Sequence, residues 1–238
     1  MFRGRPAWCR AFVSEMRRIT VFIGNFGSGK TELAINTALS LRKEGKRVRL
    51  ADVDIINPYF KSSFRRAVLE DAGVQVIGPG VLGTLPPDIM SVFDDRETCA
   101  VMDVGGDPAG ATVLGRYKDR FDEASHELDV LCVVNACRPL SDTPERVLTM
   151  MDEIEQRSRL RISALINNTN LANRTTADDL IAGQKMLIDV ARRRGLPIRF
   201  ISGRPEILNE FAEKTGVFEG ELFPIRIFMR EEWMDRET

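Results

Sequence analysis

Histidine and cysteine, which most often hold zinc or act as catalytic bases and nucleophiles, are scarce in this chain. Among its 238 residues there are one histidine, His126, and four cysteines, none of them in a Cys-x-x-Cys pair. A zinc site that needs two imidazoles is therefore excluded. His126 lies in an acidic, polar stretch that is typical of a solvated helix end, which argues against a catalytic triad. The cysteines fit a reduced, cytoplasmic protein and no disulfide framework.

The sequence also lacks an excess of either charge and any long apolar run. Lys and Arg total 34 against 35 Asp and Glu, and the net charge of −1 argues against a general nucleic-acid-binding surface. No run of about 18 apolar residues is present, so we expect no membrane span. Residues 1–15 are rich in arginine, and no apolar stretch of signal-peptide length follows them. We expect a flexible extension over 1–15 and one folded domain over 16–238.

Short apolar runs alternate with segments of helical periodicity along most of the chain. The apolar runs predict strands at 19–23, 48–53, 74–77, 98–104, 128–135, 162–167 and 198–202. The helical segments cover 31–43, 62–71, 142–158, 176–194 and 206–215. Repeated strand–helix order is typical of an α/β fold with a mostly parallel sheet and helices on both faces. We therefore expect a single domain built on a doubly wound, mostly parallel sheet.

The strongest motif is the segment Gly24–Thr31, which matches the pattern G-x-x-x-x-G-K-[ST]. An apolar strand precedes it and a helix follows, as a phosphate-binding loop (P-loop) requires. Its glycines let the backbone turn so that successive N–H groups point at phosphate oxygens, and the helix N-terminus adds positive potential. Lys30 can reach the β- and γ-phosphates, and Thr31 can ligate Mg²⁺. The nucleotide-binding residues predicted here are Gly24, Asn25, Gly27, Ser28, Gly29, Lys30, Thr31 and Glu32.

Aspartates stand at the carboxyl ends of two predicted strands, where doubly wound sheets bind ligands. Asp103 ends an apolar run, as the carboxylate that holds Mg²⁺ in P-loop proteins does, and Asp54 follows the second strand. Gly106 can bring a backbone N–H close to the γ-phosphate. Asp52 and Asp107 stay open between a role in the site and a role in a turn or helix cap. The predicted metal ligands are Thr31, Asp54 and Asp103.

At these motifs the sequence resembles the SIMIBI class of P-loop NTPases, on the branch of the MinD, ParA and CobQ proteins. The resemblance extends from Met16 to about Lys214, and its marks are Gly24–Thr31, Asp52–Asp54, Asp103–Gly106 and Leu165–Asn168. It implies that Asp54 assists Mg²⁺ or orients the attacking water, with Lys30 as the second catalytic residue. It also implies that Asn167 or Asn168 contacts the base and that Arg204 lines the base pocket. The nucleotide and a possible homodimer follow from this resemblance.

Three stretches depart from the pattern of this class. Asn25 stands where MinD and ParA proteins usually carry a signature lysine that reaches the partner subunit's phosphates. Pro58 stands where some relatives have a carboxylate that activates water. We therefore expect slow hydrolysis, or hydrolysis completed by a partner. The run 167–170 lacks the Lys and Asp with which GTPases of the class read guanine, so we predict ATP rather than GTP, with Mg²⁺.

The leading hypothesis is an Mg²⁺-dependent ATP-binding protein, a slow ATPase that acts as a nucleotide-driven switch or accessory factor for a protein client. The alternative is an ATP-dependent small-molecule enzyme, similar to dethiobiotin synthetase or CobQ, whose substrate pocket the loop 78–88 would line. The motif 57–60 could contact a partner or a second subunit, or pack beneath the next helix. The near-neutral charge and Asn25 disfavour a module that partitions DNA.

Overall fold

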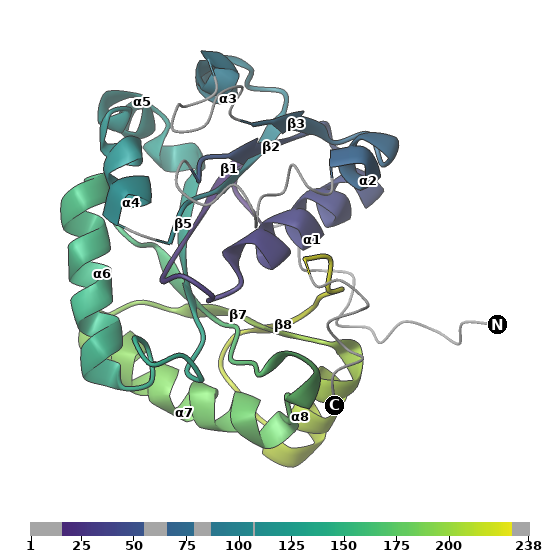
Figure 1. The fold of residues 1–238 in the computed structure, drawn as a ribbon, viewed down its shortest axis with the longest axis vertical. Coiled ribbons are helices and arrows are strands. Elements are labelled where there is room, and N and C mark those ends of the chain that lie inside the picture. Colours follow the sequence, from purple (N-terminus) through teal and green to yellow (C-terminus); the bar gives the residue numbers. More distant parts are fainter. Residues whose placement is uncertain (1–15, 55–65, 79–86, 107, 230–238) are drawn as a thin grey trace.

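The computed structural model describes residues 16–54, 66–78, 87–106 and 108–229. The expected extension 1–15, the motif 57–60 and Asp107 lie outside these residues. In the described part of the chain, eight strands form one parallel sheet in the order β3-β2-β4-β1-β5-β6-β7-β8 (Figure 1). The strands are β1 (Ile19–Ile23), β2 (Val48–Asp52), β3 (Gln75–Ile77), β4 (Cys99–Asp103), β5 (Leu128–Val134), β6 (Ala164–Asn167), β7 (Ile198–Gly203) and β8 (Glu221–Pro224). The predicted α/β fold with a parallel sheet is confirmed.

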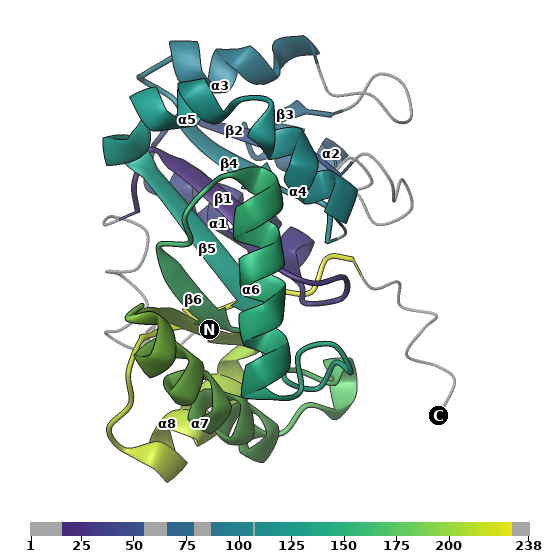
Figure 2. The ribbon, with the colours of Figure 1, turned by 90° about the vertical axis from the view of Figure 1, so that its left-hand side faces the viewer.

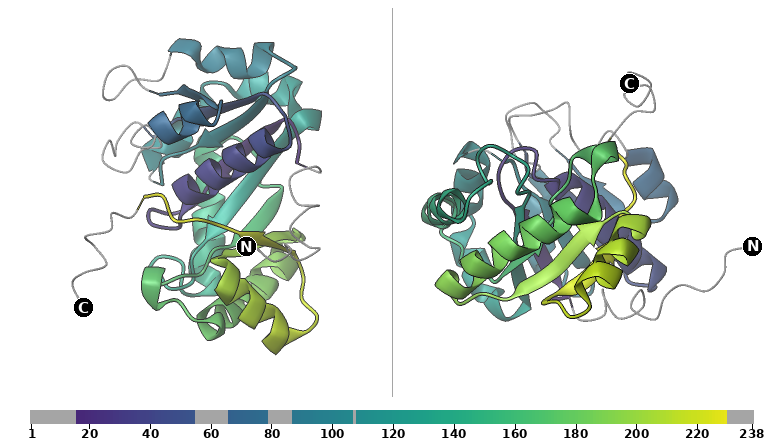
Figure 3. Two further views of the ribbon diagram at one scale, coloured as in Figure 1. Left: turned by 90° about the vertical axis from the view of Figure 1, so that its right-hand side faces the viewer. Right: turned by 90° about the horizontal axis from the view of Figure 1, so that it is seen from below.

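Helices cover both faces of this sheet, as the doubly wound pattern predicts (Figures 2 and 3). Helices α1 and α2 pack on one face, α3 to α7 pack on the other, and α8 packs beside α7. The helices are α1 (Lys30–Lys43), α2 (Arg66–Asp71), α3 (Ser91–Asp94), α4 (Pro108–Gly115), α5 (Lys118–Glu123), α6 (Pro144–Ser158), α7 (Ala177–Arg194) and α8 (Pro205–Thr215). Within the described residues, no helix combines the length and apolarity needed to cross a bilayer.

The central strand β1 is buried on both faces, which explains its continuous apolar sequence. Side chains alternate along a strand, so Ile19, Val21 and Ile23 enter the core beneath α3 to α7. Phe22 enters the opposite core, beneath α1. Neither face of β1 meets solvent, and the strand holds the loop that follows it in a fixed place.

Because all strands run the same way, their carboxyl ends meet at one edge of the sheet. The P-loop follows β1 at this edge, Asp54 follows β2, and Gly106 follows β4. Asn168 follows β6 and Arg204 follows β7. Segments far apart in the sequence are therefore brought to one side of the molecule, as doubly wound sheets predict.

The sequence patterns missed strand β8 and the short helices α3, α4 and α5. The α4 sequence is poor in helix-forming residues because it contains Gly110 and Gly115, and glycine is unfavourable inside a helix. Close packing explains both glycines. A Cβ at Gly110 would lie 2.7 Å from the Gly105 carbonyl oxygen, and one at Gly115 would lie 2.9 Å from the Arg157 carbonyl oxygen. Tertiary contact thus overrides local propensity in this helix.

Candidate nucleotide site

The P-loop between β1 and α1 needs its glycines both for conformation and for space. Gly24, Gly27 and Gly29 have φ values of 142°, 74° and 93°, which other residues rarely adopt. A Cβ at Gly24 would lie 2.3 Å from the Val133 carbonyl oxygen. A Cβ at Gly29 would lie 2.2 Å from Asn168 Nδ2. The motif therefore forms a tight cradle whose rim is shared with β5 and with the loop after β6.

Lys30 is the first residue of α1 and is largely buried at the base of this cradle. Its ammonium Nζ donates a hydrogen bond to the Asn25 carbonyl oxygen at 2.9 Å, so the side chain spans the loop from one end to the other. Its charge therefore lies within the curve of the loop, beside the helix N-terminus. Both features favour an anion at this point.

The side chains predicted to hold Mg²⁺ come together at the carboxyl ends of β2 and β4. The Thr31 hydroxyl donates a hydrogen bond to the buried carboxylate of Asp103. Burial raises the pKa of Asp103 to about 6, although Thr31 and Lys30 oppose the shift, and the negative charge of Asp54 adds to it. A hydroxyl and a carboxylate are the oxygen donors that Mg²⁺ prefers, so these residues fit the ion.

The loops after β2 and β4 complete the phosphate side. Asp54 lies among the residues that line the pocket, and its backbone N–H donates to Asp52 Oδ1 at 3.2 Å. Asp52 itself is fully buried, next to Asp103 in the sheet register. A Cβ at Gly106 would lie 2.5 Å from the Phe26 backbone nitrogen. The loop after β4 is therefore in direct contact with the P-loop.

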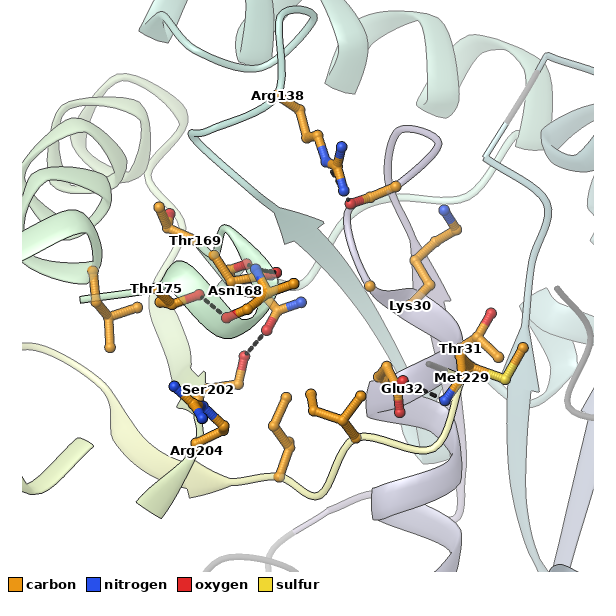
Figure 4. A pocket seen from close by; sticks show the side chains of 18 of the residues that line it. Lys30, Thr31, Glu32, Arg138, Asn168, Thr169, Thr175, Ser202, Arg204 and Met229 are labelled. Atoms are coloured by element: carbon orange, nitrogen blue, oxygen red, sulfur yellow. Dashed lines mark hydrogen bonds between the residues drawn. The ribbon is translucent and has the colours of Figure 1, made fainter. Parts of the chain in front are cut away.

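A pocket of about 360 Å³ lies between the P-loop, the loops after β6 and β7, and the segment that follows β8 (Figure 4). Its phosphate side contains Gly27, Gly29, Lys30, Thr31, Asp54 and Gly106. Its far side contains Asn168, Thr169, Asn170, Asn173, Thr175, Leu180, Ser202, Arg204, Ile207, Ile225, Ile227 and Met229. This volume is within the usual range for a small-molecule or cofactor site.

The two asparagines at the end of β6 have different surroundings. Asn167 Nδ2 donates to the Leu180 carbonyl oxygen at 3.1 Å and to Gln184 Oε1 at 3.0 Å, so its amide faces α7. Asn168 instead lines the pocket, where its Nδ2 donates to the Ser28 carbonyl oxygen at 2.7 Å. The Ser202 hydroxyl donates to Asn168 Oδ1 at 2.8 Å. Asn168 thus fastens the P-loop to the ends of β6 and β7.

Arg204, predicted to line the base pocket, lines this cavity and forms an ion pair with Glu206 at 3.2 Å. Asn25, predicted to contact nucleotide, directs its Nδ2 to the Leu140 carbonyl oxygen at 3.0 Å. The Ser28 hydroxyl is buried beneath the loop and has no hydrogen-bond partner among the described residues. The predicted residues are therefore gathered at one edge, although Asn167, Asn25 and Ser28 direct their side chains away from the cavity or beneath the loop.

Two parts of the site carry no sequence motif. Arg138, in the turn after β5, donates from Nε to the Gly27 carbonyl oxygen at 3.2 Å and lines the pocket. Its position after an apolar run was the one available signal, but the order of strands in the sheet was needed to place it beside the P-loop.

The second is the segment Ile225–Met229, which runs along α1 to the pocket. The Glu32 carboxylate accepts the backbone N–H groups of Phe228, at 2.9 Å, and Met229, at 2.7 Å. Asn36 pairs with the backbone of Arg226 in both directions, at 2.8 Å each. Glu32, predicted as a nucleotide contact, therefore uses its side chain to hold this segment, and Ile225, Ile227 and Met229 form an apolar wall.

A scan against protein-family models and a search of curated protein sequences each found no match. Solved structures of FtsY proteins are similar in fold. Cell division protein FtsY from Thermotoga maritima is 19% identical over 77% of this chain and 60% of its own, with a TM-score of 0.53. Chloroplast FtsY from Physcomitrella patens is 17% identical over 84% and 59%, with a TM-score of 0.54. Signal recognition particle receptor FtsY from Elizabethkingia anophelis, in complex with GDP, is 16% identical over 77% and 56%, with a TM-score of 0.51.

These likenesses concern the fold. This chain spans about 60% of the length of the FtsY structures that it matches. FtsY has the fold of SIMIBI-class P-loop NTPases, on a branch beside that of MinD and ParA. The chain therefore has the fold of the class that its motifs resemble.

Proposed function

We propose that this chain, built on a SIMIBI-class fold, binds a nucleoside triphosphate with Mg²⁺ and acts as a nucleotide-driven switch for a protein client. The observation that carries the proposal is the arrangement of Lys30, Thr31 and Asp103 around one glycine cradle. Lys30 spans the loop, and Thr31 is hydrogen-bonded to the buried Asp103. Such a loop binds phosphates through its N–H groups and its lysine.

Each residue has a chemical role in this proposal. Lys30 neutralises the β- and γ-phosphates, and Thr31 and Asp103 hold Mg²⁺. Mg²⁺ held there would supply positive charge that neutralises the phosphate oxygens. Asp54, which lies on the same side of the pocket, orients the attacking water. Because Gly106 touches the P-loop, the loop after β4 is placed to respond to the terminal phosphate.

We propose ATP as the nucleotide. A guanine-reading site offers a carboxylate to the N–H groups of the base edge, and among the described pocket residues the acids are Glu32 and Asp54. Glu32 is hydrogen-bonded to the segment after β8, and Asp54 lies on the phosphate side. Asn170 holds its amide on the Asn168 carbonyl oxygen at 2.7 Å. The far side of the pocket therefore suits adenine better.

The GDP complex of a structurally similar FtsY protein supports a guanine nucleotide as the second candidate. A site can also read guanine through backbone carbonyls, which the loops after β6 and β7 contain. Direct competition between the two triphosphates distinguishes the candidates, since an adenine site and a guanine site differ in the edge that they recognise.

The protein client is supported by the surface beside the P-loop. Phe26 and Leu140 are 58% and 67% exposed, respectively. They belong to two loops that the Asn25–Leu140 hydrogen bond joins, so both lie close to the pocket. Large exposed apolar side chains beside a polar site are typical of protein contact surfaces. A client bound there would contact the loop that holds the phosphates.

Nucleotide binding is tested by displacement of a fluorescent nucleotide by ATP or GTP, with Mg²⁺ or with a chelator. We expect Lys30→Ala to weaken triphosphate binding at least about 100-fold, which is about 2.7 kcal/mol. The control is Lys185→Ala, because Lys185 is an exposed lysine on α7. Basal hydrolysis should be slow, well below about 1 per second.

Binding that is equal in wild type and Lys30→Ala would overturn the proposed site. Tighter displacement by GTP than by ATP would replace ATP with GTP and leave the switch in place. Rapid basal hydrolysis, at about 10 per second or more, would contradict a switch that waits for its client.

A further inference from the structure

We propose that Arg138 supplies, from within the same chain, the cation that contacts the phosphate chain at the place where Asn25 replaces the signature lysine. The inference rests on the proposed nucleotide site and adds to it a residue that belongs to none of the sequence motifs. Arg138 lies in the turn after β5 and lines the same pocket as Lys30 (Figure 4).

The guanidinium of Arg138 lies against the P-loop itself. Its Nε donates to the Gly27 carbonyl oxygen at 3.2 Å. A Cβ at Gly27 would lie 3.2 Å from Arg138 Nε and 3.4 Å from Cζ, so the glycine leaves the room that the guanidinium occupies. Gly27 therefore serves the arginine as well as the turn of the loop.

The remaining donors of this guanidinium are available to a ligand. A guanidinium has five N–H donors in a planar fork, and the Gly27 carbonyl oxygen accepts from one of them. Among the residues that the structure describes, no carboxylate lies within ion-pair distance of Arg138. Arg204, the other arginine of the pocket, is paired with Glu206. Of the two arginines that line the described part of the pocket, Arg138 is thus the one without a paired carboxylate.

The turn that carries Arg138 is held in place by the fully buried Asn135. The Asn135 carbonyl oxygen accepts the Arg138 backbone N–H at 3.1 Å and the Ser141 hydroxyl at 2.8 Å. Asn135 Oδ1 accepts the Cys137 backbone N–H at 3.0 Å. A charge on such a fixed turn needs little reorganisation when a phosphate arrives, which is the condition for strong electrostatic stabilisation.

Asn25 takes part in the same arrangement. Its Nδ2 donates to the carbonyl oxygen of Leu140, in the turn that carries Arg138. Asn25 therefore lacks the charge of a signature lysine, and its side chain instead holds the turn that carries Arg138 against the P-loop of the same chain. Asn25 is a positioning residue, and Arg138 delivers the charge.

The step that Arg138 assists is hydrolysis of the terminal phosphate by water. The water oxygen bonds to the γ-phosphorus, and the bond from that phosphorus to the β–γ bridging oxygen breaks. The electron pair stays on the nucleoside diphosphate, and the water loses a proton to solvent as inorganic phosphate forms. Negative charge grows on the bridging and γ-oxygens, and a nearby guanidinium stabilises it. No second protomer is needed for this contribution.

The experiment compares Arg138→Ala, Arg138→Lys and the control Arg192→Ala, an exposed arginine on α7. Readouts are phosphate release in single-turnover reactions and affinity for a non-hydrolysable triphosphate and for the diphosphate. We expect Arg138→Ala to slow hydrolysis about 100-fold or more. Arg138→Lys should retain part of the rate, and Arg192→Ala all of it. Diphosphate affinity should change less than about threefold, since the loop itself is intact.

Two further readouts separate charge delivery from a merely structural role. Millimolar guanidinium should restore part of the Arg138→Ala rate, which a misfolded loop would not allow. The rate per molecule of wild type should be independent of protein concentration. Hydrolysis by Arg138→Ala within about threefold of wild type would overturn the proposal, as would equal losses of diphosphate and triphosphate affinity.

Failure of the proposed function gives a different result. If wild type binds neither ATP nor GTP, both the proposed nucleotide site and the role of Arg138 are overturned. A wild type that binds triphosphate but does not hydrolyse it leaves the affinity ratio as the test. In that case Arg138→Ala must lose triphosphate affinity at least about tenfold more than diphosphate affinity, and an unchanged ratio rejects Arg138.

Discussion

The two sides of the pocket are constructed differently. The phosphate side is formed mainly by eight consecutive residues, Gly24–Thr31, whose conformation is specified by their own glycines. The far side is assembled from the ends of β6 and β7 and from the segment Ile225–Met229. A local loop carries its geometry in its sequence, whereas a wall built from distant segments exists only when the sheet has formed. Asn168 joins the two sides, because it belongs to the far side and holds the Ser28 carbonyl oxygen.

The largest expected effect is a loss of triphosphate affinity in Gly29→Ala, a change that tests whether the P-loop depends on the far side. In Gly29→Ala the new Cβ would collide with Asn168 Nδ2, only 2.2 Å away, at a residue with φ of 93°. We expect triphosphate affinity to fall at least about 100-fold, about 2.7 kcal/mol. The double variant Gly29→Ala with Asn168→Ala removes the collision but keeps the backbone strain, which costs about 1–3 kcal/mol.

Titration of a fluorescent nucleotide into the three variants completes the double-mutant cycle. We expect the double variant to lose less triphosphate affinity than the sum of the two single losses. The difference is the coupling energy between Gly29 and Asn168. Additive losses would mean that Asn168 does not constrain Gly29, and the two sides would then be independent. Asn167→Ala is the matched control, because its amide faces α7 rather than the loop.

The same contrast explains what the sequence could predict. The P-loop, Asp54 and Asp103 could be predicted to share one edge of the sheet because strand ends and glycine spacing are local signals. The place of Arg138 was missed because it depends on the order of strands in the sheet. The hydrogen bonds from Phe228 and Met229 to Glu32 were missed because they depend on β8, a short strand with a weak pattern. The family resemblance predicted that Asn167 or Asn168 contacts the base, whereas the hydrogen bonds of Asn168 to Ser28 and Ser202 depend on tertiary structure. Helix α4 was missed because Gly110 and Gly115 are unfavourable in a helix, and the close packing that requires them is not visible in the sequence.

A pH effect of similar size, on stability rather than on affinity, sharpens the comparison on the phosphate side. Burial raises the pKa of Asp103 from 3.8 to about 6, so the native state binds more protons than the unfolded state between those values. The free energy of unfolding of the metal-free protein should therefore fall as pH rises from about 4 to 6, by about 3 kcal/mol from this group. Asp103→Asn removes this titration.

Denaturant unfolding of both proteins at pH 4.5, 5.5 and 7 measures the difference. Toward pH 7, wild type should lose stability relative to Asp103→Asn. Mg²⁺ with nucleotide should reduce this relative loss, because it favours the ionised carboxylate of wild type. A gap that does not change with pH would show that the Asp103 carboxylate does not titrate in this range. Asp103 belongs to the phosphate side of the pocket. The pH dependence of the free energy of unfolding should therefore be the same in Asn168→Ala as in wild type.

The smallest expected effect concerns the far side alone. Glu32→Gln keeps one acceptor oxygen for the Phe228 and Met229 N–H groups but loses the charge, which weakens charge-assisted hydrogen bonds by about 1 kcal/mol. The segment Ile225–Met229 should then hold the base less firmly, and nucleotide affinity should fall about three- to tenfold. Inorganic triphosphate, which has no base, should bind Glu32→Gln as it binds wild type, since the P-loop is unaltered. Equal losses for nucleotide and inorganic triphosphate would mean that Glu32 acts on the phosphate side, and the assignment of Glu32 and the segment Ile225–Met229 to the far side would fail.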